Sequence, residues 1–205
     1  MTSSLAGQRE IADGSGVAET GSEAETTEKI ETGVCLSPMD WNTLQAIVAD
    51  GSVSVMRRLG RSRETLQSYR EFKERINETY SSIVDKIMID VFKCDWKVNE
   101  DGKMEHVPTA HGWSAGSLSG PPSRSALGPH AGPFFVKNDF PYNLAPGIEH
   151  YLLWSDHVMS ADEIDIHLQS DPIAKQSSSR LTFVNPVELQ SIPDIHHVHV
   201  LLKLR

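Results

Sequence analysis

The sequence has few of the features that mark secreted, membrane-spanning or metal-binding proteins. Its two cysteines, Cys35 and Cys94, fall in no CxxC or Cys/His cluster, which argues against a disulfide framework and a zinc knuckle. No apolar run approaches the ~18 residues that a membrane-spanning helix needs, and the first residues lack the basic start and apolar stretch of a signal peptide. We therefore expect a cytoplasmic protein that does not enter the membrane.

Positive charge is also scarce. The 205 residues include 19 Lys and Arg against 28 Asp and Glu, and no basic block is large enough to follow a phosphate backbone. We therefore do not expect nucleic acid as a partner. Residues 1–34 contain seven acids, two bases and no aromatic residue, a composition that predicts a disordered acidic tail. The remaining residues, 35–205, are of the right length for a single α+β domain.

Periodic apolar residues predict a helical first half of this domain. The stretch "SPMDWNTLQAIVADG" predicts a short amphipathic helix with Ser37 as its cap, and residues 53–59 favour a second, briefer one. From Ser62 to near Cys94 apolar side chains recur every three or four residues, which predicts one helix of about eight turns. Four arginines at its start either form a solvated helix end or anchor an anionic ligand: Arg57, Arg58, Arg61 and Arg63.

The second half predicts strands. Gly, Ser and Pro dominate residues 97–133, which is typical of a long loop or a partly ordered insertion. Ser160 and Glu163 have the spacing of a capping box before a short helix. The predicted fold class is α+β, with the helical N-terminal half packed on a C-terminal antiparallel sheet. Four segments read as its strands: 134–136, 148–155, 180–185 and 196–204.

The last predicted strand, in "SIPDIHHVHVLLKLR", contains three histidines. Side chains at positions i and i+2 of a strand share a face, so His197 and His199 point one way and His196 points the other. Two imidazoles placed side by side admit three uses. They can bind a metal, act as a nucleophilic or acid/base pair, or bond the backbone in a structural strand.

Two segments, "NDFPYNLAPGIEHYLLWSDH" and "QSIPDIHHVHVLL", resemble the histidine-triad (HIT) proteins over about residues 134–205. The resemblance implies that His197 attacks the α-phosphorus of a nucleotide without a metal and that His199 is the third member of the triad. It also implies an upstream pair formed by His150 and His157. The sequence departs from the pattern at the first triad position, which is isoleucine.

A second resemblance covers about residues 38–203. The segments "MDWNTLQAIV", "GRSRETLQSYREFKERI", "KNDFPYNLAPGIEHYLLWS" and "FVNPVELQSIPDIHHVHVLL" are similar to those of the fungal N-acetylglucosamine-induced protein family. This similarity implies a cytosolic protein tied to the amino-sugar response. It brings no established reaction.

Proline-bearing turns precede the predicted strands at 148–155 and 196–204, and their polar side chains complete the predicted site. If the strands that carry His150 and His197 are neighbours, polar side chains from both turns converge on a pocket suited to a small phosphorylated sugar or nucleotide. One candidate function is a HIT-like hydrolase or transferase without metal or other cofactor, and the alternative is a non-catalytic protein that binds an amino-sugar metabolite. Asn and Asp also bond their own backbone in turns, so a structural role stays open. The predicted catalytic residues are His197, His199 and His150, and the predicted ligand-binding residues are Asn138, Asp139, Tyr142, Asn185, Gln190 and Ser191.

Overall fold

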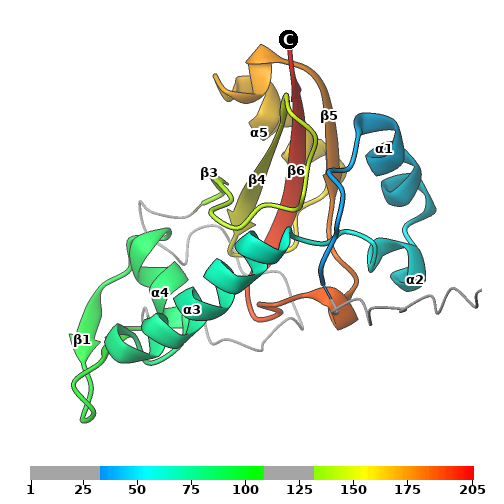
Figure 1. The fold of residues 1–205 in the computed structure, drawn as a ribbon. Helices are drawn as coiled ribbons and strands as arrows, with labels where there is room; N and C mark the ends of the chain where they lie inside the picture. The colour runs from blue at the N-terminus through cyan, green and yellow to red at the C-terminus, as the bar shows by residue number, and fades with distance from the viewer. Residues whose placement is uncertain (1–32, 109–131) are drawn as a thin grey trace, which may run out of the picture. The chain divides into compact units, whose positions relative to one another are not determined.

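The computed structural model describes residues 33–108 and 132–205, which belong to one unit of the chain. Nearly all of the predicted acidic tail, and residues 109–131 of the predicted loop, lie outside the described residues. The described residues form helices and two antiparallel sheets, so the predicted α+β class is confirmed (Figure 1). In this part of the chain no helix is both long and apolar enough to cross a membrane.

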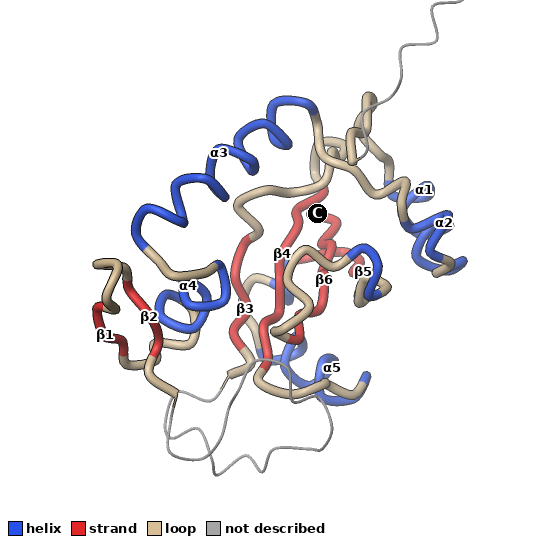
Figure 2. Tube along the Cα trace, turned by 90° about the horizontal axis from the view of Figure 1, so that it is seen from below, coloured by secondary structure: helices blue, strands red, loops and turns tan. Residues whose placement is uncertain are grey.

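The larger sheet contains the four predicted strands, with the bounds β3 (Phe134–Lys137), β4 (Ile148–Ser155), β5 (Ser177–Phe183) and β6 (His196–Leu204). All neighbours pair antiparallel, in the order β3-β4-β6-β5 (Figure 2). The last strand of the sequence, β6, is therefore interior. Its residues 197–202 are buried, and their content of Val and Leu is typical of a central strand.

Helices cover both faces of this sheet. Because side chains alternate along a strand, Leu153 and Val200 share one face, where they pack with α5 (Ala161–Ser170). The opposite face is covered at one end by α1 (Trp41–Asp50) and at the other end by α4 (Ile83–Asp90). The three histidines of the predicted site lie on this second face, between the two helices.

The first helix begins three residues later than the sequence suggests. Asp40, and not Ser37, is its N-cap, since the carboxylate accepts the backbone N–H of Thr43 at 2.8 Å. The helix ends at Gly51, whose φ of 66° lies in the left-handed region that glycine enters without a steric penalty.

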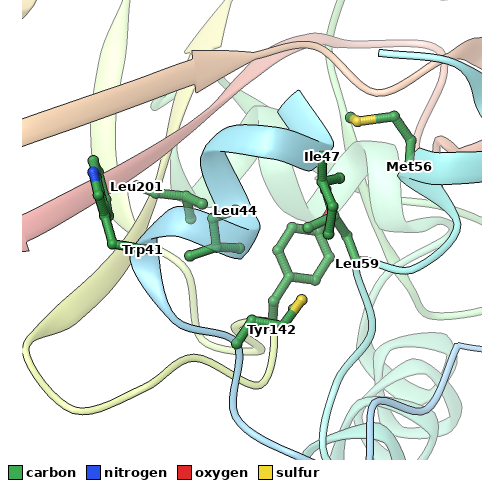
Figure 3. Close-up of a cluster of buried hydrophobic side chains, with 8 residues drawn as sticks. Trp41, Leu44, Ile47, Met56, Leu59, Tyr142 and Leu201 are labelled. Carbon is green, nitrogen blue, oxygen red and sulfur yellow. The ribbon is translucent and has the colours of Figure 1, made fainter. Parts of the chain in front are cut away.

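The buried side of α1 packs on the sheet and on the turn before β4. Leu44 and Ile47 are almost fully buried, in one cluster with Leu201 of β6 and Tyr142 (Figure 3). The short helix α2 (Val53–Met56) adds Met56 to the same cluster. This packing holds Tyr142 over the histidine-bearing face of the sheet.

The single long helix predicted from residue 62 is wrong. It is two helices, because α3 (Arg63–Thr79) ends at Tyr80, whose backbone is extended with φ −112° and ψ 152°. The next helix, α4, starts after Ser82, whose hydroxyl accepts the N–H of Asp85 at 3.1 Å. A serine that can cap a new helix competes with continuation of the old one. The apolar spacing survives the break because each helix buries one side, so periodicity alone does not reveal it.

The segment 97–133 begins with ordered structure. A hairpin of β1 (Trp96–Val98) and β2 (Met104–His106) forms the second, two-stranded sheet. His106 fastens it to α4, since its ring Nδ1 lies 2.6 Å from the carboxylate of Asp85. No strand was predicted here because three-residue strands are too short to show a period of two.

The capping box predicted for α5 is present and gives a first testable expectation. Ser160 Oγ accepts the N–H of Glu163 at 3.3 Å, and the Glu163 carboxylate accepts the N–H of Ser160 at 2.9 Å. We expect Ser160→Ala to lower the free energy of unfolding by about 1 kcal/mol, measured by urea denaturation. Ser160→Asp should keep most of the stability, because it retains an acceptor. Equal losses in both variants would contradict the capping role.

Candidate functional site

Three histidines meet at the centre of the larger sheet. His150 on β4 and His197 and His199 on β6 share one face, and their exposed fractions are 2, 8 and 6%. The centroid of the His199 ring lies 5.1 Å from that of His150 and 5.4 Å from that of His197. The structure thus brings together the three residues that were predicted to be catalytic.

Aromatic rings enclose two of these histidines. Tyr142 stacks on His150 with 4.6 Å between centroids, and Phe183 stacks on His199 at 5.1 Å. Burial among these rings lowers the pKa of His150 to about 3 and holds the pKa of His199 well below its usual value, and the charge of Arg61 acts in the same direction. Both imidazoles are therefore neutral at pH 7.

The hydrogen bonds at His150 fix which ring nitrogen holds the proton. The amide oxygen of Asn138 accepts the Phe140 backbone N–H at 2.9 Å, so the amide nitrogen of Asn138 faces His150 Nδ1, at 3.3 Å. The backbone N–H of Tyr142 points at the same Nδ1, also at 3.3 Å. With two donors facing it, Nδ1 must present its lone pair, and the proton of the neutral ring is on Nε2.

The same reasoning continues to His199. His150 Nε2–H donates to His199 Nδ1 at 2.9 Å, so neutral His199 holds its proton on Nε2. The structure places the amide nitrogen of Asn185 3.0 Å from that nitrogen and 3.0 Å from the Tyr142 hydroxyl. Because the Nε2–H of His199 must donate, we assign the Asn185 amide in the opposite orientation, with Oδ1 accepting from His199 and from the Tyr142 hydroxyl. One directed chain of hydrogen bonds thus runs from Asn138 to Asn185.

His197 is held in a different way. Its Nδ1 lies 2.9 Å from the carbonyl oxygen of Ile195, which only accepts, so the proton of the neutral ring is on Nδ1 and the lone pair is on Nε2. Trp154 packs against the ring with 4.7 Å between centroids. Burial lowers the pKa of His197, and the bond to Ile195 partly opposes that shift. Within the described ranges no hydrogen bond occupies Nε2, the atom that a nucleophilic or basic imidazole uses.

The predicted ligand-binding residues fall into three groups. The hydrogen-bond chain contains three of them: Asn138, Tyr142 and Asn185. Gln190 supports the chain, because its amide nitrogen donates to the backbone carbonyl of Asn185 at 2.7 Å. Asp139 and Ser191 are exposed at the surface. The polar residues of these two turns that reach the cluster therefore orient the rings of His150 and His199.

His157, which the histidine-triad resemblance pairs with His150, is not brought to the cluster. Its Nδ1 lies 2.6 Å from the carboxylate of Asp156, and its Nε2 lies 3.5 Å from that of Glu163 on α5. Since α5 covers the face of the sheet opposite His150, the two histidines belong to different surroundings.

Two contacts of the cluster were not predicted from the sequence. Phe183 stacks on His199, and Arg61 lies near enough to His150 and His199 for its charge to depress both pKa values. The alternation in β5 places Phe183 on one face, but only the register with β6 makes it a neighbour of His199. Arg61 precedes His150 by 89 residues in the sequence, and it was singled out there only as one of four clustered arginines.

Two further features of the described residues concern possible ligands. Among the described residues, no group of three or more His, Cys, Asp or Glu side chains is arranged to hold a metal ion. A hollow of about 340 Å³ lies beside Trp41, Ile148 and Lys203. In the register of β4 and β6 this hollow is at the end of the sheet away from His197, so it is separate from the candidate site.

The directed chain predicts the tautomer of each ring. We expect His150 and His199 to be protonated on Nε2 and His197 on Nδ1, the reverse arrangement. Long-range ¹H–¹⁵N correlation spectra of ¹⁵N-histidine-labelled protein at pH 7 distinguish the two forms, and His150→Gln, His197→Gln and His199→Gln assign the signals. A His197 ring protonated on Nε2 would contradict the geometry, since the Ile195 carbonyl would then face a lone pair.

The fold and the site define an α+β protein with a neutral histidine cluster on the central strands of an antiparallel sheet. The model of the family described as "Protein of unknown function (DUF3605)" matches residues 40–203, and the chain belongs to this family. It is 30% identical over 178 residues to an uncharacterised protein of Saccharomyces cerevisiae, a match that covers 79% of this chain and 77% of the yeast protein.

A second relative is N-acetylglucosamine-induced protein 1 of Candida albicans. It is 26% identical over 191 residues, which cover 85% of this chain and 71% of that protein. The predicted membership of the fungal N-acetylglucosamine-induced family, with no assigned reaction, is thereby confirmed. Among solved structures, the crystal structure of HTC1 is similar, with a TM-score of 0.50 and 25% identity over 81% of this chain and 85% of that one.

Proposed function

We propose that this protein is a cytoplasmic hydrolase or transferase that acts on a small phosphorylated sugar or nucleotide, with His197 as nucleophile or general base. The observation that carries the proposal is the hydrogen bonding of the two ring nitrogens of His197. The Ile195 carbonyl holds its Nδ1–H, and no hydrogen bond from the described residues engages its Nε2. A neutral, oriented imidazole with a free lone pair is the form that attacks phosphorus or removes a proton from water.

The nucleophilic route has two steps. In the first, the lone pair of His197 Nε2 forms a bond to phosphorus while the bond from phosphorus to the leaving oxygen breaks, and that oxygen leaves with the bonding pair and takes up a proton. In the second, water attacks the phosphorus, the P–N bond breaks and returns the electron pair to Nε2, and the water loses a proton to solvent, which balances the proton taken up in the first step. The Ile195 carbonyl stabilises the cationic ring between the steps, because it accepts the Nδ1–H throughout.

The resemblance to histidine-triad proteins supports this choice of nucleophile, since it points to the same residue. Ile195 occupies the first triad position, so its backbone carbonyl, rather than an imidazole, orients His197. The name of the Candida relative favours an amino-sugar phosphate or a nucleotide sugar as the ligand. Two free cysteines in the described residues are compatible with the cytoplasm.

A second candidate function is binding of an amino-sugar metabolite without turnover. The observation that favours it is the saturation of the neighbouring rings. Both nitrogens of His150 and both nitrogens of His199 have hydrogen-bond partners inside the fold. These two imidazoles are therefore oriented but not free to exchange protons with a ligand.

Ligand screening separates the two functions. We would incubate the full chain with nucleoside phosphates, nucleotide sugars and amino-sugar phosphates, and record both the melting temperature and product formation. A ligand that binds the native state must raise the melting temperature. Turnover that is lost in His197→Gln supports the enzyme, and a thermal shift without turnover supports the binding protein. The absence of both at millimolar ligand would reject the proposed function.

A further inference from the structure

Arg61 carries a partly buried positive charge that no carboxylate balances among the described residues. Its guanidinium carbon lies 4.4 Å from the centroid of the Tyr69 ring, and its Nε–H donates to the carbonyl of Phe140 at 3.0 Å. A guanidinium in this position has lost part of its hydration without gaining a counter-charge. The arrangement therefore costs free energy unless an anion completes it.

The two contacts also fix the orientation of the guanidinium. With Nε bonded to Phe140 and one face on Tyr69, the Nη1 and Nη2 groups remain, and neither donates to any of the described residues. Two parallel N–H donors form the fork that binds a phosphate or carboxylate group at two oxygens. The side chain is thus held ready for a planar contact with an oxyanion.

Arg61 stands beside the histidine cluster. Phe140, which holds its Nε, lies between Asn138 and Tyr142, the two residues whose N–H groups face His150. The charge of Arg61 lowers the pKa of both His150 and His199. Since the ring of His199 lies between those of His150 and His197, and Phe140 is on the His150 side, Arg61 approaches the row of imidazoles at the His150 end.

A second cation shares the same aromatic ring. Lys73 Nζ lies 5.6 Å from the centroid of Tyr69, one helical turn along α3, and it too forms no ion pair among the described residues. Two positive charges near one ring add to the positive potential around it, which favours an anion of double charge nearby. The ring itself gives Arg61 a cation–π contact that keeps the fork in place.

We propose that Arg61, supported by Lys73, binds a phosphate group of the ligand at the His150 end of the cluster. The proposal deepens the function proposed above, because it assigns a doubly charged phosphate to the ligand at a point distinct from His197. It does not need turnover, and it would hold equally for a protein that only binds. The anion contacts the Nη groups of Arg61, and Tyr69 keeps them aligned.

Titration with inorganic pyrophosphate tests the site without knowledge of the ligand. We would measure the dissociation constant by calorimetry at low ionic strength for the full chain and for four variants. We expect Arg61→Met to weaken binding at least about tenfold and Arg61→Lys to weaken it less, since lysine keeps the charge and loses the fork. Lys73→Met should have a smaller effect, and Arg58→Met, an exposed neighbour, should change the constant less than about twofold.

Two results would overturn the proposal. One is wild-type protein that does not bind pyrophosphate at millimolar concentration, and the other is equal weakening by Arg61→Met and Arg58→Met, which would indicate only general attraction. If Arg61→Met unfolds, the comparison of Arg61→Lys with Arg58→Lys decides in the same way. His197→Gln should bind pyrophosphate as the wild type does. Loss of turnover with intact pyrophosphate binding therefore tests the catalytic role of His197, whereas loss of pyrophosphate binding tests the anion site at Arg61.

Discussion

Replacing His197 with alanine is expected to lower kcat/KM for the phosphorylated substrate by about 10²- to 10⁴-fold, the usual contribution of a positioned acid, base or nucleophile. The loss should appear in kcat, because the imidazole acts on the reacting atom. Burial against Trp154 means that the variant also loses packing, at a cost of about 1–3 kcal/mol. Rates must therefore be compared at a temperature at which both proteins are folded.

His196→Ala is the matched control. His196 is the adjacent residue on the same strand, but its side chain lies on the other face of the sheet, as the alternation of β6 requires. We expect this variant to keep kcat/KM within a few-fold of the wild type. Equal losses in the two variants would mean that the strand, and not the His197 ring, matters for activity.

Lowering the pH from 7 to 5 is expected to destabilise the protein strongly. The pKa of His150 is lowered from 6.5 to about 3 by burial, and nearby Arg61 and His197 act in the same direction. Folding therefore favours the neutral ring. Its contribution to stability is complete above pH 6.5 and is lost as the pH falls from 6.5 toward 3. Over two pH units His150 alone accounts for about 2 kcal/mol, and His199 adds a loss of the same sign.

Urea denaturation between pH 5 and 7 measures this dependence. This range lies above the ordinary pKa of carboxyl groups in unfolded chains, so their protonation contributes little. In His150→Gln the slope of unfolding free energy against pH should fall by up to about 1.4 kcal/mol per pH unit below pH 6, because one titrating group is removed. A wild-type stability that is flat from pH 7 to pH 5 would contradict the neutral, buried cluster.

The sequence predicts the strands better than the first long helix. Val and Leu alternate with the histidines in β6, and this period of two is visible without any partner. The break at Tyr80 is not, because both flanking helices keep the apolar spacing. What ends α3 is the extended Tyr80 and the cap supplied by Ser82.

In the candidate site, too, strand geometry is predictable from the sequence, whereas contacts made by packing are not. Placement of His197 and His199 on one face follows from strand geometry, and the structure has their rings 5.4 Å apart. The sequence did not reveal that Ile195 orients His197 through a backbone carbonyl, because carbonyl direction depends on the local turn. The part played by Arg61 depends on Tyr69 and Phe140, which are brought together by packing and not by proximity in sequence.

The availability of His197 Nε2 is tested most directly by reacting the full chain with phosphoramidate, a small phosphoryl donor that needs no binding pocket. The P–N bond of the reagent breaks, ammonia leaves, and a new P–N bond forms at an unprotonated imidazole nitrogen. Peptide mapping by mass spectrometry at alkaline pH then locates the phosphate. We predict phosphate on His197 in the wild type and in His196→Ala, and none on His150 or His199, whose lone pairs accept hydrogen bonds. Labelling of other histidines with His197 left unmodified would contradict its role as the reactive residue.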